Sequence, residues 1–253
     1  MAKDSGRSAR ASVWLERKAP RGGRSGQPSG LDRERITAAS VRLLDAEGLA
    51  KFSMRRLAGE LNVTAMSLYW YVDTKDDLLE LALDAAFGEL RLPDPDGAEE
   101  PDWRAQLRDL AAGYRALLLR HPWLSRLAGQ YLNIGPNALA FSRTVQRVVR
   151  RTGLPAHRVM SAISAVFQFV YGYGTLESQF MSRIADSGLS ADDYYQQALT
   201  EAQRHPQAAD MIQESREFME ARGGDTVAEM MDRDFTFALD LLIAGIEVMV
   251  ERG

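Results

Sequence analysis

Residues 53–79 read SMRRLAGELNVTAMSLYWYVDTKDDLL, and this stretch decides the fold. Ser53 can cap a short helix over residues 54–61, and Thr64 can cap a second helix that reaches to about Tyr71. Helix, three-residue turn and helix have the spacing of a helix-turn-helix, whose second helix enters the major groove of DNA. Thr74 then begins the S/T-x-x-D/E pattern of a capping box. The stretch therefore predicts three consecutive helices with a recognition helix in the middle.

The second helix of this motif carries side chains that suit a DNA groove. Leu68 and Val72, at i and i+4, can be buried together, which turns the other side chains elsewhere. Small and apolar residues suit thymine methyl groups, and hydroxyl groups can reach phosphates or base edges. The alternative is that the aromatic residues belong to the core of a small helical bundle. The side chains turned away from Leu68 and Val72 are those of Thr64, Ala65, Met66, Ser67, Trp70 and Tyr71.

Helical periodicity continues on both sides of the motif. Asp32 can cap a helix that Gly48 ends, and its apolar residues recur on one face. No alternating run between hairpin turns predicts a strand, so the fold class is all-α. Residues 92–101, LPDPDGAEEP, form a break between two modules. We expect an arm over 1–30, a first domain over 31–90 and a second over 102–253. In the second domain the predicted helices lie near 102–120, 122–130, 136–152, 155–186, 191–201 and 225–251.

Composition excludes several classes of protein. The chain has 253 residues, no Cys and a formal net charge of -4, which excludes a disulfide framework and thiolate zinc sites. Residues 238–250 are the most apolar run, but they are too few to span a membrane, which takes about 20 residues. Phosphate-binding loops, nucleophile elbows and zinc-protease motifs are all missing, so we expect no enzyme activity, no cofactor and no metal. We therefore expect a cytoplasmic protein that does not enter a membrane.

The charge is unevenly distributed along the chain. Residues 1–30 carry seven basic and two acidic side chains, whereas residues 31–90 carry seven basic and eleven acidic ones. Residues 51–75 are locally basic, with four cations against two acids. The arm includes an apolar island, Val13–Leu15, which either belongs to a disordered tail or orders against DNA or the protein body. Arg in such an arm suits a narrow minor groove, so the arm is a candidate for DNA contact.

Residues 32–90 resemble the DNA-binding domain of the tetracycline-repressor (TetR) family of bacterial regulators, most specifically in the stretch quoted above. The resemblance implies that Ser53 and Arg55 lie at the phosphate backbone or groove edge and that Lys75 contacts a phosphate. A cation beside helix N-terminal amides suits that role. Asn62 stands where the family usually has Gly, and Asn tolerates the left-handed backbone of such a turn. The recognition-helix residues implied are Ala65, Met66, Ser67, Tyr69, Trp70 and Tyr71.

The second domain resembles the tetracycline-repressor-like C-terminal subclass in HPWLSRL (121–127), GPNAL (135–139) and YGYGTLE (171–177). The resemblance implies a ligand-binding and dimerisation domain whose helices near 155–186 and 225–251 pair across a two-fold axis. Glu177 matches a position that helps to hold a magnesium–tetracycline complex in this subclass. No His falls in the matching loop, so we expect a different ligand and no metal.

Polar groups that interrupt apolar helices are the candidate ligand contacts, although each could equally be satisfied within the protein. The polar candidates are Gln130, Asn133, Asn137, Gln168, Tyr171 and Glu177, and the apolar walls are Trp123, Phe141 and Phe167. The three histidines, His121, His157 and His205, lie at predicted helix ends, where we expect surface or capping residues.

Together these features predict a ligand-responsive transcriptional regulator. We expect a homodimeric repressor that binds a palindromic DNA operator and is released by a small hydrophobic or amphipathic effector. The alternatives are a helix-turn-helix activator, a non-specific DNA-binding protein and an adaptor whose helix-turn-helix binds protein.

Overall fold

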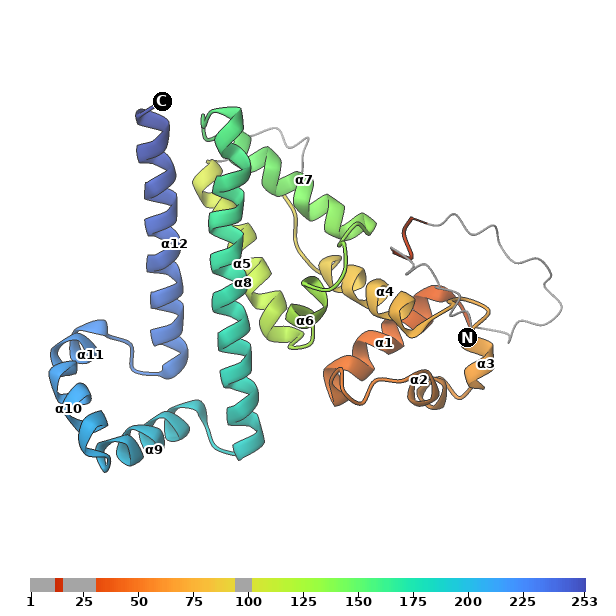
Figure 1. Ribbon diagram of the computed structural model, residues 1–253, viewed down its shortest axis with the longest axis horizontal. Coiled ribbons are helices and arrows are strands. Elements are labelled where there is room, and N and C mark those ends of the chain that lie inside the picture. Colours follow the sequence, from red (N-terminus) through yellow and green to blue (C-terminus); the bar gives the residue numbers. More distant parts are fainter. Residues whose placement is uncertain (1–11, 16–30, 94–101) are drawn as a thin grey trace, which may run out of the picture. The chain divides into compact units, whose positions relative to one another are not determined.

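The computed structural model describes residues 12–15, 31–93 and 102–253, and over these ranges it contains helices and no strand (Figure 1). The all-α prediction is confirmed, whereas the predicted break at 92–101 lies almost entirely outside the described residues. In chain order the helices are α1 Arg33–Glu47, α2 Met54–Glu60, α3 Ala65–Leu68, α4 Lys75–Phe87, α5 Trp103–Arg120, α6 Leu124–Ala128, α7 Pro136–Arg150, α8 Ala156–Ser187, α9 Ala191–Gln203, α10 Pro206–Glu214, α11 Arg216–Arg222 and α12 Val227–Glu251.

Side-chain caps set the starts of the first four helices. Asp32 accepts the Arg35 backbone N–H at 2.7 Å, and Ser53 accepts that of Arg56 at 3.2 Å. Such caps satisfy amides that a helix start leaves without partners. The capping box predicted at Thr74 is present, with Asp77 as its reciprocal partner. These caps lie where the sequence predicted them, because a cap depends only on residues within one turn of it.

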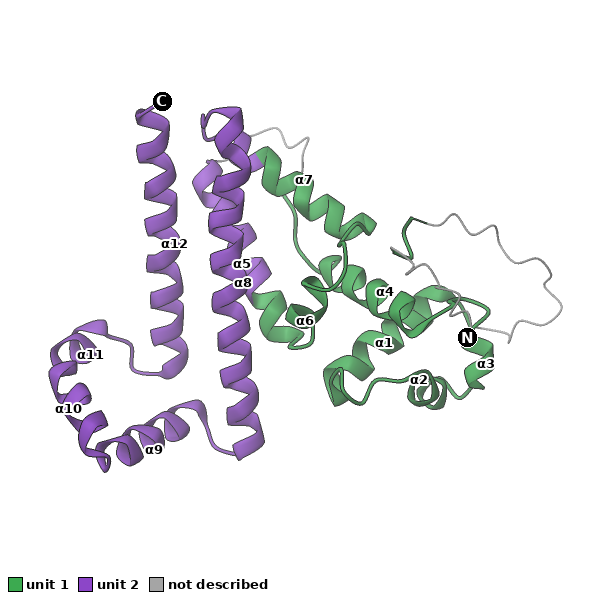
Figure 2. Ribbon diagram, in the orientation of Figure 1, with its two compact units in different colours: residues 1–100, 116–147 green, residues 101–115, 148–253 purple. Residues whose placement is uncertain are grey.

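The chain divides into two compact units, residues 1–100 with 116–147 and residues 101–115 with 148–253 (Figure 2). The division passes through α5 and α7 rather than between helices. The domain boundaries predicted from sequence, 31–90 and 102–253, therefore stay a prediction. In the first unit, α1 packs on α4, and α2 packs on α3. The apolar positions predicted for α1 are buried there: Ile36, Ala39, Leu43 and Leu44.

The second unit contains α8 and α12, which run side by side in opposite directions (Figure 1). Between them the chain forms α9, α10 and α11. We expected α9 but not α10 and α11, over residues 206–222. These two helices bury no residue, so the apolar stripe that reveals a core helix is missing from their sequence.

Helix α8 is long and apolar enough to cross a membrane by length and composition, with a mean hydropathy of 1.3 in its most apolar window. At 18 residues, that window is longer than the 13-residue run at 238–250. Core helices of soluble proteins meet the same criterion, so one such helix is weak support for a span. Only 22% of the window is buried within one chain. Most of this window is therefore exposed or half-buried in a single chain.

Candidate nucleic-acid interface and effector-binding residues

The turn between α2 and α3 holds the helix-turn-helix in shape. Asn62 has a φ of 53°, the left-handed backbone expected where the sequence has Asn in place of Gly. Thr64 then caps α3, accepting the Ser67 backbone N–H at 3.3 Å. Leu68 is fully buried and Val72 is 2% exposed, as their i, i+4 spacing predicted. These anchors fix which side of α3 faces outward.

The outward side of α3 and of the turn that follows it is apolar and aromatic. Met66 is 71% exposed, Trp70 52% and Tyr69 40%. Single exposed apolar residues are normal, whereas apolar residues that cluster on the surface mark an interaction site. The alternative was that the aromatic residues belong to the core of a small helical bundle. For Tyr69 and Trp70 that alternative is wrong, because both side chains are exposed. Helix α3 ends at Leu68, so both residues lie in its C-terminal turn rather than within the helix.

Tyr71 differs from its neighbours because its hydroxyl donates to the Leu31 carbonyl oxygen at 2.6 Å. This hydrogen bond connects the turn after α3 to Leu31, which lies just before α1. Tyr71 therefore has a structural contact in addition to any contact with DNA.

The helices before and after α3 in the chain carry cations. Arg56 pairs with Glu47 of α1, and its Nε donates to that carboxylate at 2.8 Å. Arg55 is exposed and makes no ion pair within the described part of the chain. Lys75, the first residue of α4, places its Nζ 5.6 Å from the Phe52 ring centroid. Of the two neighbouring arginines, Arg55 is therefore the one whose charge is available to a phosphate.

Five candidate ligand contacts lie in the first unit, and most of them have partners within it. Trp123 is 3% exposed, and its indole N–H donates to the Asp45 carboxylate of α1 at 2.6 Å. Phe141 packs on Phe87, with ring centroids 5.9 Å apart. Gln130 is exposed. Asn133 donates to two backbone carbonyls, while its Oδ1 is buried without a partner among the described residues.

Asn137 is part of an anchor between α4 and the start of α7. The buried carboxylate of Asp84 accepts the Ala138 backbone N–H at 2.9 Å and the Asn137 side-chain amide at 3.1 Å. Negative charge at a helix N-terminus is stabilised by the amides and dipole there. The approach is close: a Cβ added at Gly135 would lie 2.3 Å from the Asp84 carboxyl carbon. Sequence reasoning missed Asp84, because nothing in its own helix shows that it faces another helix's start.

His121 is buried between two carboxylates, which corrects the expectation of a surface or capping residue. Its Nδ1 lies 2.7 Å from Asp45 Oδ1, and its Nε2 lies 3.2 Å from Glu89 Oε1. Burial disfavours the imidazolium, but hydrogen bonds and charge from Asp45 and Glu89 outweigh burial and raise the His121 pKa above its ordinary 6.5. His121 and Trp123 together bind the end of α1 to the α5–α6 turn.

The other four candidate ligand contacts lie on α8 in the second unit. Glu177 is buried and forms two hydrogen bonds with Arg115, at 2.6 and 2.5 Å. Phe167 lies 6.2 Å from the Tyr114 ring, and burial raises the Tyr114 pKa. Tyr171 is half-buried, whereas Gln168 is exposed and donates to the Ser164 hydroxyl at 2.9 Å. Glu177 is therefore neutralised within the chain.

Arg115 was not singled out from sequence, although it connects three helices. Besides Glu177 it pairs with Asp232 of α12 at 2.7 Å, and its guanidinium lies 4.6 Å from the Phe235 ring centroid. Burial opposes its charge, yet hydrogen bonds to Glu177 and Asp232 raise the Arg115 pKa. No group of His, Asp and Glu side chains in the described part of the chain has the arrangement of a metal site.

A helix-turn-helix with an exposed aromatic face, in one of two helical units, defines a DNA-binding regulator with two helical parts. Residues 36–82 match the family model of bacterial regulatory proteins of the tetR family, and residues 94–250 match that of the tetracyclin repressor-like C-terminal domain. The chain belongs to the TetR family of transcriptional regulators, and it is a ligand-responsive DNA-binding regulator. The resemblance found in the sequence is confirmed.

Relatives of known class support this assignment. An HTH-type transcriptional regulator of Saccharopolyspora erythraea is 45% identical over 58% of this chain and 61% of its own length. The HTH-type transcriptional repressor DrrR1 of Streptomyces coeruleorubidus is 32% identical over 87% of this chain and 78% of its own. The crystal structure of Streptomyces coelicolor ActR in complex with actinorhodin aligns with a TM-score of 0.67 at 27% identity, covering 87% of this chain and 96% of ActR. These relatives are regulators rather than enzymes.

Proposed function

We propose that this protein is a cytoplasmic, homodimeric repressor that binds a palindromic operator and is released by a small amphipathic effector. The observation that carries the proposal is the exposed face of α3 and its C-terminal turn, formed by Met66, Tyr69 and Trp70. In the sequence, Arg55 of α2 precedes these residues and Lys75 of α4 follows them. Apolar contacts with thymine methyls and aromatic contacts with the groove would read bases, while the two cations would neutralise phosphates. The remaining proposed DNA contacts are Ser53, Thr64, Ala65, Ser67 and Tyr71.

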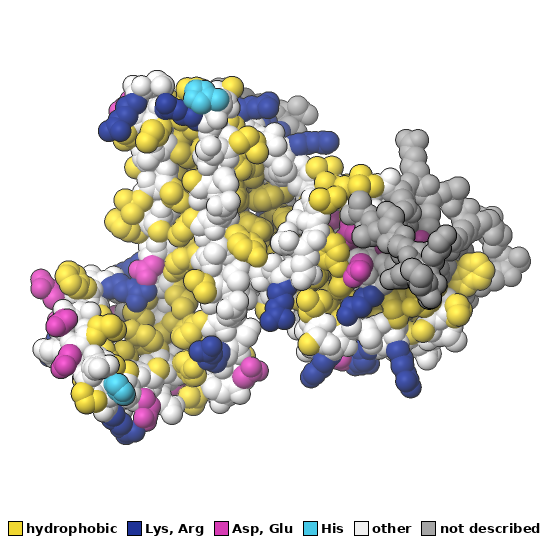
Figure 3. Space-filling view, in the orientation of Figure 1, with side chains coloured by type: hydrophobic (Ala, Val, Ile, Leu, Met, Phe, Trp, Pro, Cys, Tyr) yellow, Lys and Arg dark blue, Asp and Glu magenta, His cyan; other side chains and the backbone are white. Residues whose placement is uncertain are grey.

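Dimerisation would place two copies of α3 on one DNA duplex. Helices α8 and α12 expose large apolar residues in a single chain, among them Leu176 at 69% and Phe237 at 66%. Figure 3 shows hydrophobic side chains gathered over these two helices. An exposed apolar surface along long helices favours pairing with an identical surface across a two-fold axis. The operator of such a dimer repeats its half-site about one turn of DNA apart.

For the effector contacts we propose the candidates already named, taken within each unit by itself. ActR has been crystallised in complex with actinorhodin. In the first unit we expect Asn133 to contribute most, and in the second unit we expect Phe167 and Tyr171 to do so. Asn133 has a buried acceptor without a partner, and the other two are aromatic and half-buried. Trp123, Asn137 and Glu177 have structural partners that a ligand would have to replace.

The test is footprinting on the chain's own promoter region, followed by gel shifts with variants. Trp70→Ala should lose at least about tenfold in operator affinity, because stacking and apolar contacts contribute roughly 1–3 kcal/mol each. It should keep the melting temperature and dimeric state of the wild type, since Trp70 supports no core. The control is Met211→Ala, an exposed apolar residue of α10. Full affinity in Trp70→Ala, or protection without a palindrome, would contradict the proposal and favour non-specific binding.

An activator with the same helix-turn-helix is the second candidate. Protection upstream of the promoter elements, with transcription in vitro rising on addition of protein, would favour it over a repressor.

A further inference from the structure

Residues Ser12–Leu15 contact α4 within the first unit. The sequence left open whether this apolar island orders at all. Ser12 is 1% exposed, and its hydroxyl donates to the Glu80 carboxylate of α4, 68 residues away in sequence. The Val13 backbone N–H donates to the same carboxylate at 3.4 Å. A buried acid of α4 thus accepts hydrogen bonds from the N-terminal segment.

The segment itself forms a closed turn. The Trp14 backbone N–H donates to the Ser12 hydroxyl oxygen at 3.2 Å, and the Leu15 N–H donates to the Ser12 carbonyl oxygen at 3.3 Å. Three successive amides, of residues 13, 14 and 15, therefore have acceptors within the protein. An isolated tetrapeptide would leave such amides to water, so their pairing depends on the docked position.

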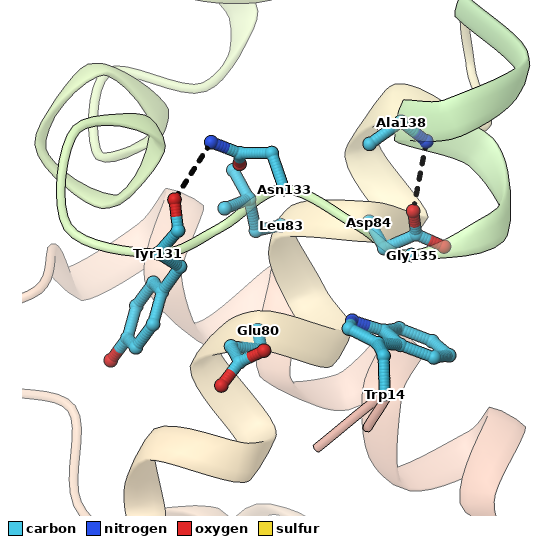
Figure 4. Close-up of a pocket in the computed structure, with 8 residues that line it drawn as sticks. All are labelled: Trp14, Glu80, Leu83, Asp84, Tyr131, Asn133, Gly135 and Ala138. Atoms are coloured by element: carbon cyan, nitrogen blue, oxygen red, sulfur yellow. Dashed lines mark hydrogen bonds between the residues drawn. The ribbon is translucent and has the colours of Figure 1, made fainter. Parts of the chain in front are cut away.

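Trp14 closes a groove between α4 and residues 131–138 (Figure 4). Its ring lies within 5.9 Å of the Arg33 guanidinium, a cation–π distance. The space left in the groove is about 10 Å³, on the order of one water molecule. The side chains that line this space with Trp14 are Glu80, Leu83 and Asp84 of α4, and Tyr131, Asn133, Gly135 and Ala138.

We propose that this groove is a docking site for the chain's own residues 12–15, and that the docked segment holds α4 and residues 131–138 at a fixed spacing. One wall is supplied by α4 and the other by the chain between α6 and α7. Trp14 therefore keeps its contacts only while the two walls keep their separation. By linkage, a movement of α4 away from residues 131–138 releases the segment, and docking opposes that movement. This inference goes beyond the proposed function and does not depend on DNA binding.

Two truncations with the same charge test the spacing role. Removing residues 1–11 or 1–15 deletes the same four charged side chains, Lys3, Asp4, Arg7 and Arg10, so the truncations differ only in the docking segment. Hydrogen–deuterium exchange of residues 131–138, followed by mass spectrometry on the protein alone, should match wild type after the first truncation. After the second it should be faster by about fivefold or more, the factor for losing one typical net hydrogen bond. Equal exchange in the two truncations would overturn the spacing role.

Point variants of the full chain test docking itself. Ser12→Ala and Trp14→Ala should each speed exchange of the amides of residues 13–15 by about fivefold or more, and Glu80→Ala should do the same from the other side. Leu15→Ala is the matched control, because Leu15 is 59% exposed and supplies no docking side chain. The first two variants leave α4 intact, so their result stands even if Glu80→Ala unfolds. Wild-type exchange rates in Ser12→Ala and Trp14→Ala would refute docking, whatever the operator assays show.

Discussion

Gly135 leaves no room for a side chain beside Asp84. A Cβ there would lie 2.3 Å from the Asp84 carboxyl carbon and 2.8 Å from its Cβ, so Asp84 would have to move. Asp84 could then no longer accept the Ala138 N–H at the start of α7. We expect Gly135→Ala to lower the free energy of unfolding by roughly 1–3 kcal/mol, the usual cost of overpacking, in urea titrations.

Gly59→Ala is the control for the Gly135 variant. Gly59 lies in α2, and a Cβ added there meets nothing within 4 Å. Ala in a helix is better than Gly by about 0.5–1 kcal/mol, so this variant should be more stable than wild type. A Gly135→Ala protein that gained stability in the same way would show that Asp84 has room to move.

His121 gives the protein a stability that depends on pH. Its pKa in the folded chain is raised above the ordinary 6.5, because Asp45 and Glu89 outweigh the effect of burial. The folded state holds this proton more tightly than the unfolded chain, so the stabilisation is fully present below pH 6.5 and is lost as the pH rises through the raised pKa.

We therefore expect the melting temperature of the wild type to fall as the pH rises from 6.5 through the raised pKa of His121. The melting temperature of His121→Gln should fall less over the same pH range. Calorimetry over a pH series, with His205→Gln as an exposed control, measures the difference. Identical slopes for wild type and His121→Gln would show that the proton on His121 does not stabilise the fold.

At the scale of elements, local chemistry made the helix starts predictable. Caps at Asp32, Ser53, Thr64 and Thr74 each satisfy amides within one turn, so the sequence contains all the information needed. The positive φ of Asn62 was predictable for the same reason. The short α3 was not, because the residues after Leu68 are compatible with a further helical turn.

Partners far apart in sequence could not be predicted. Glu80 and Asp84 lie one turn apart on α4, and each is buried by a different segment, one at the N-terminus and one at the start of α7. The pairing of Glu177 with Arg115 likewise needs α5 and α8 in register. A sequence pattern shows that these acids are polar interruptions, and only the fold shows what they face.

Arg115 joins α5, α8 and α12 through charge. Its side chain and that of Glu177 are 11% and 8% exposed, so removing the cation would leave a buried carboxylate without a partner. We expect Arg115→Met to lower the free energy of unfolding by about 3–5 kcal/mol, the range for breaking a buried pair.

The double variant Arg115→Met with Glu177→Gln should recover part of that loss, because no buried charge remains. Chemical unfolding of the two single variants and the double variant forms the cycle. Additive losses would show that Arg115 and Glu177 stabilise the second unit independently.

For the whole molecule, the net charge of -4 is a poor guide to the surface that meets DNA. Three of the eleven acids in residues 31–90 are buried and hydrogen-bonded, namely Asp77, Glu80 and Asp84. They hold the start of α4, the N-terminal segment and the start of α7. These three acids of the first unit therefore stabilise its fold, while Arg55 of α2 is exposed and Lys75 of α4 is half-buried.

Operator binding should depend on the apolar face of α8 and α12, far along the chain from α3. Phe237→Glu would place a charge where one chain exposes 66% of a phenylalanine. Burying that carboxylate against an identical surface is costly, so the variant should be monomeric at micromolar concentration by analytical ultracentrifugation. It should also lose at least about 100-fold in operator affinity, because a monomer binds one half-site only. Leu132→Glu, at a residue 58% exposed in the first unit, is the control and should stay dimeric. If the Phe237→Glu protein is dimeric, the dimer interface does not include this face of α12. If it is monomeric and keeps full operator affinity, one helix-turn-helix is enough for binding.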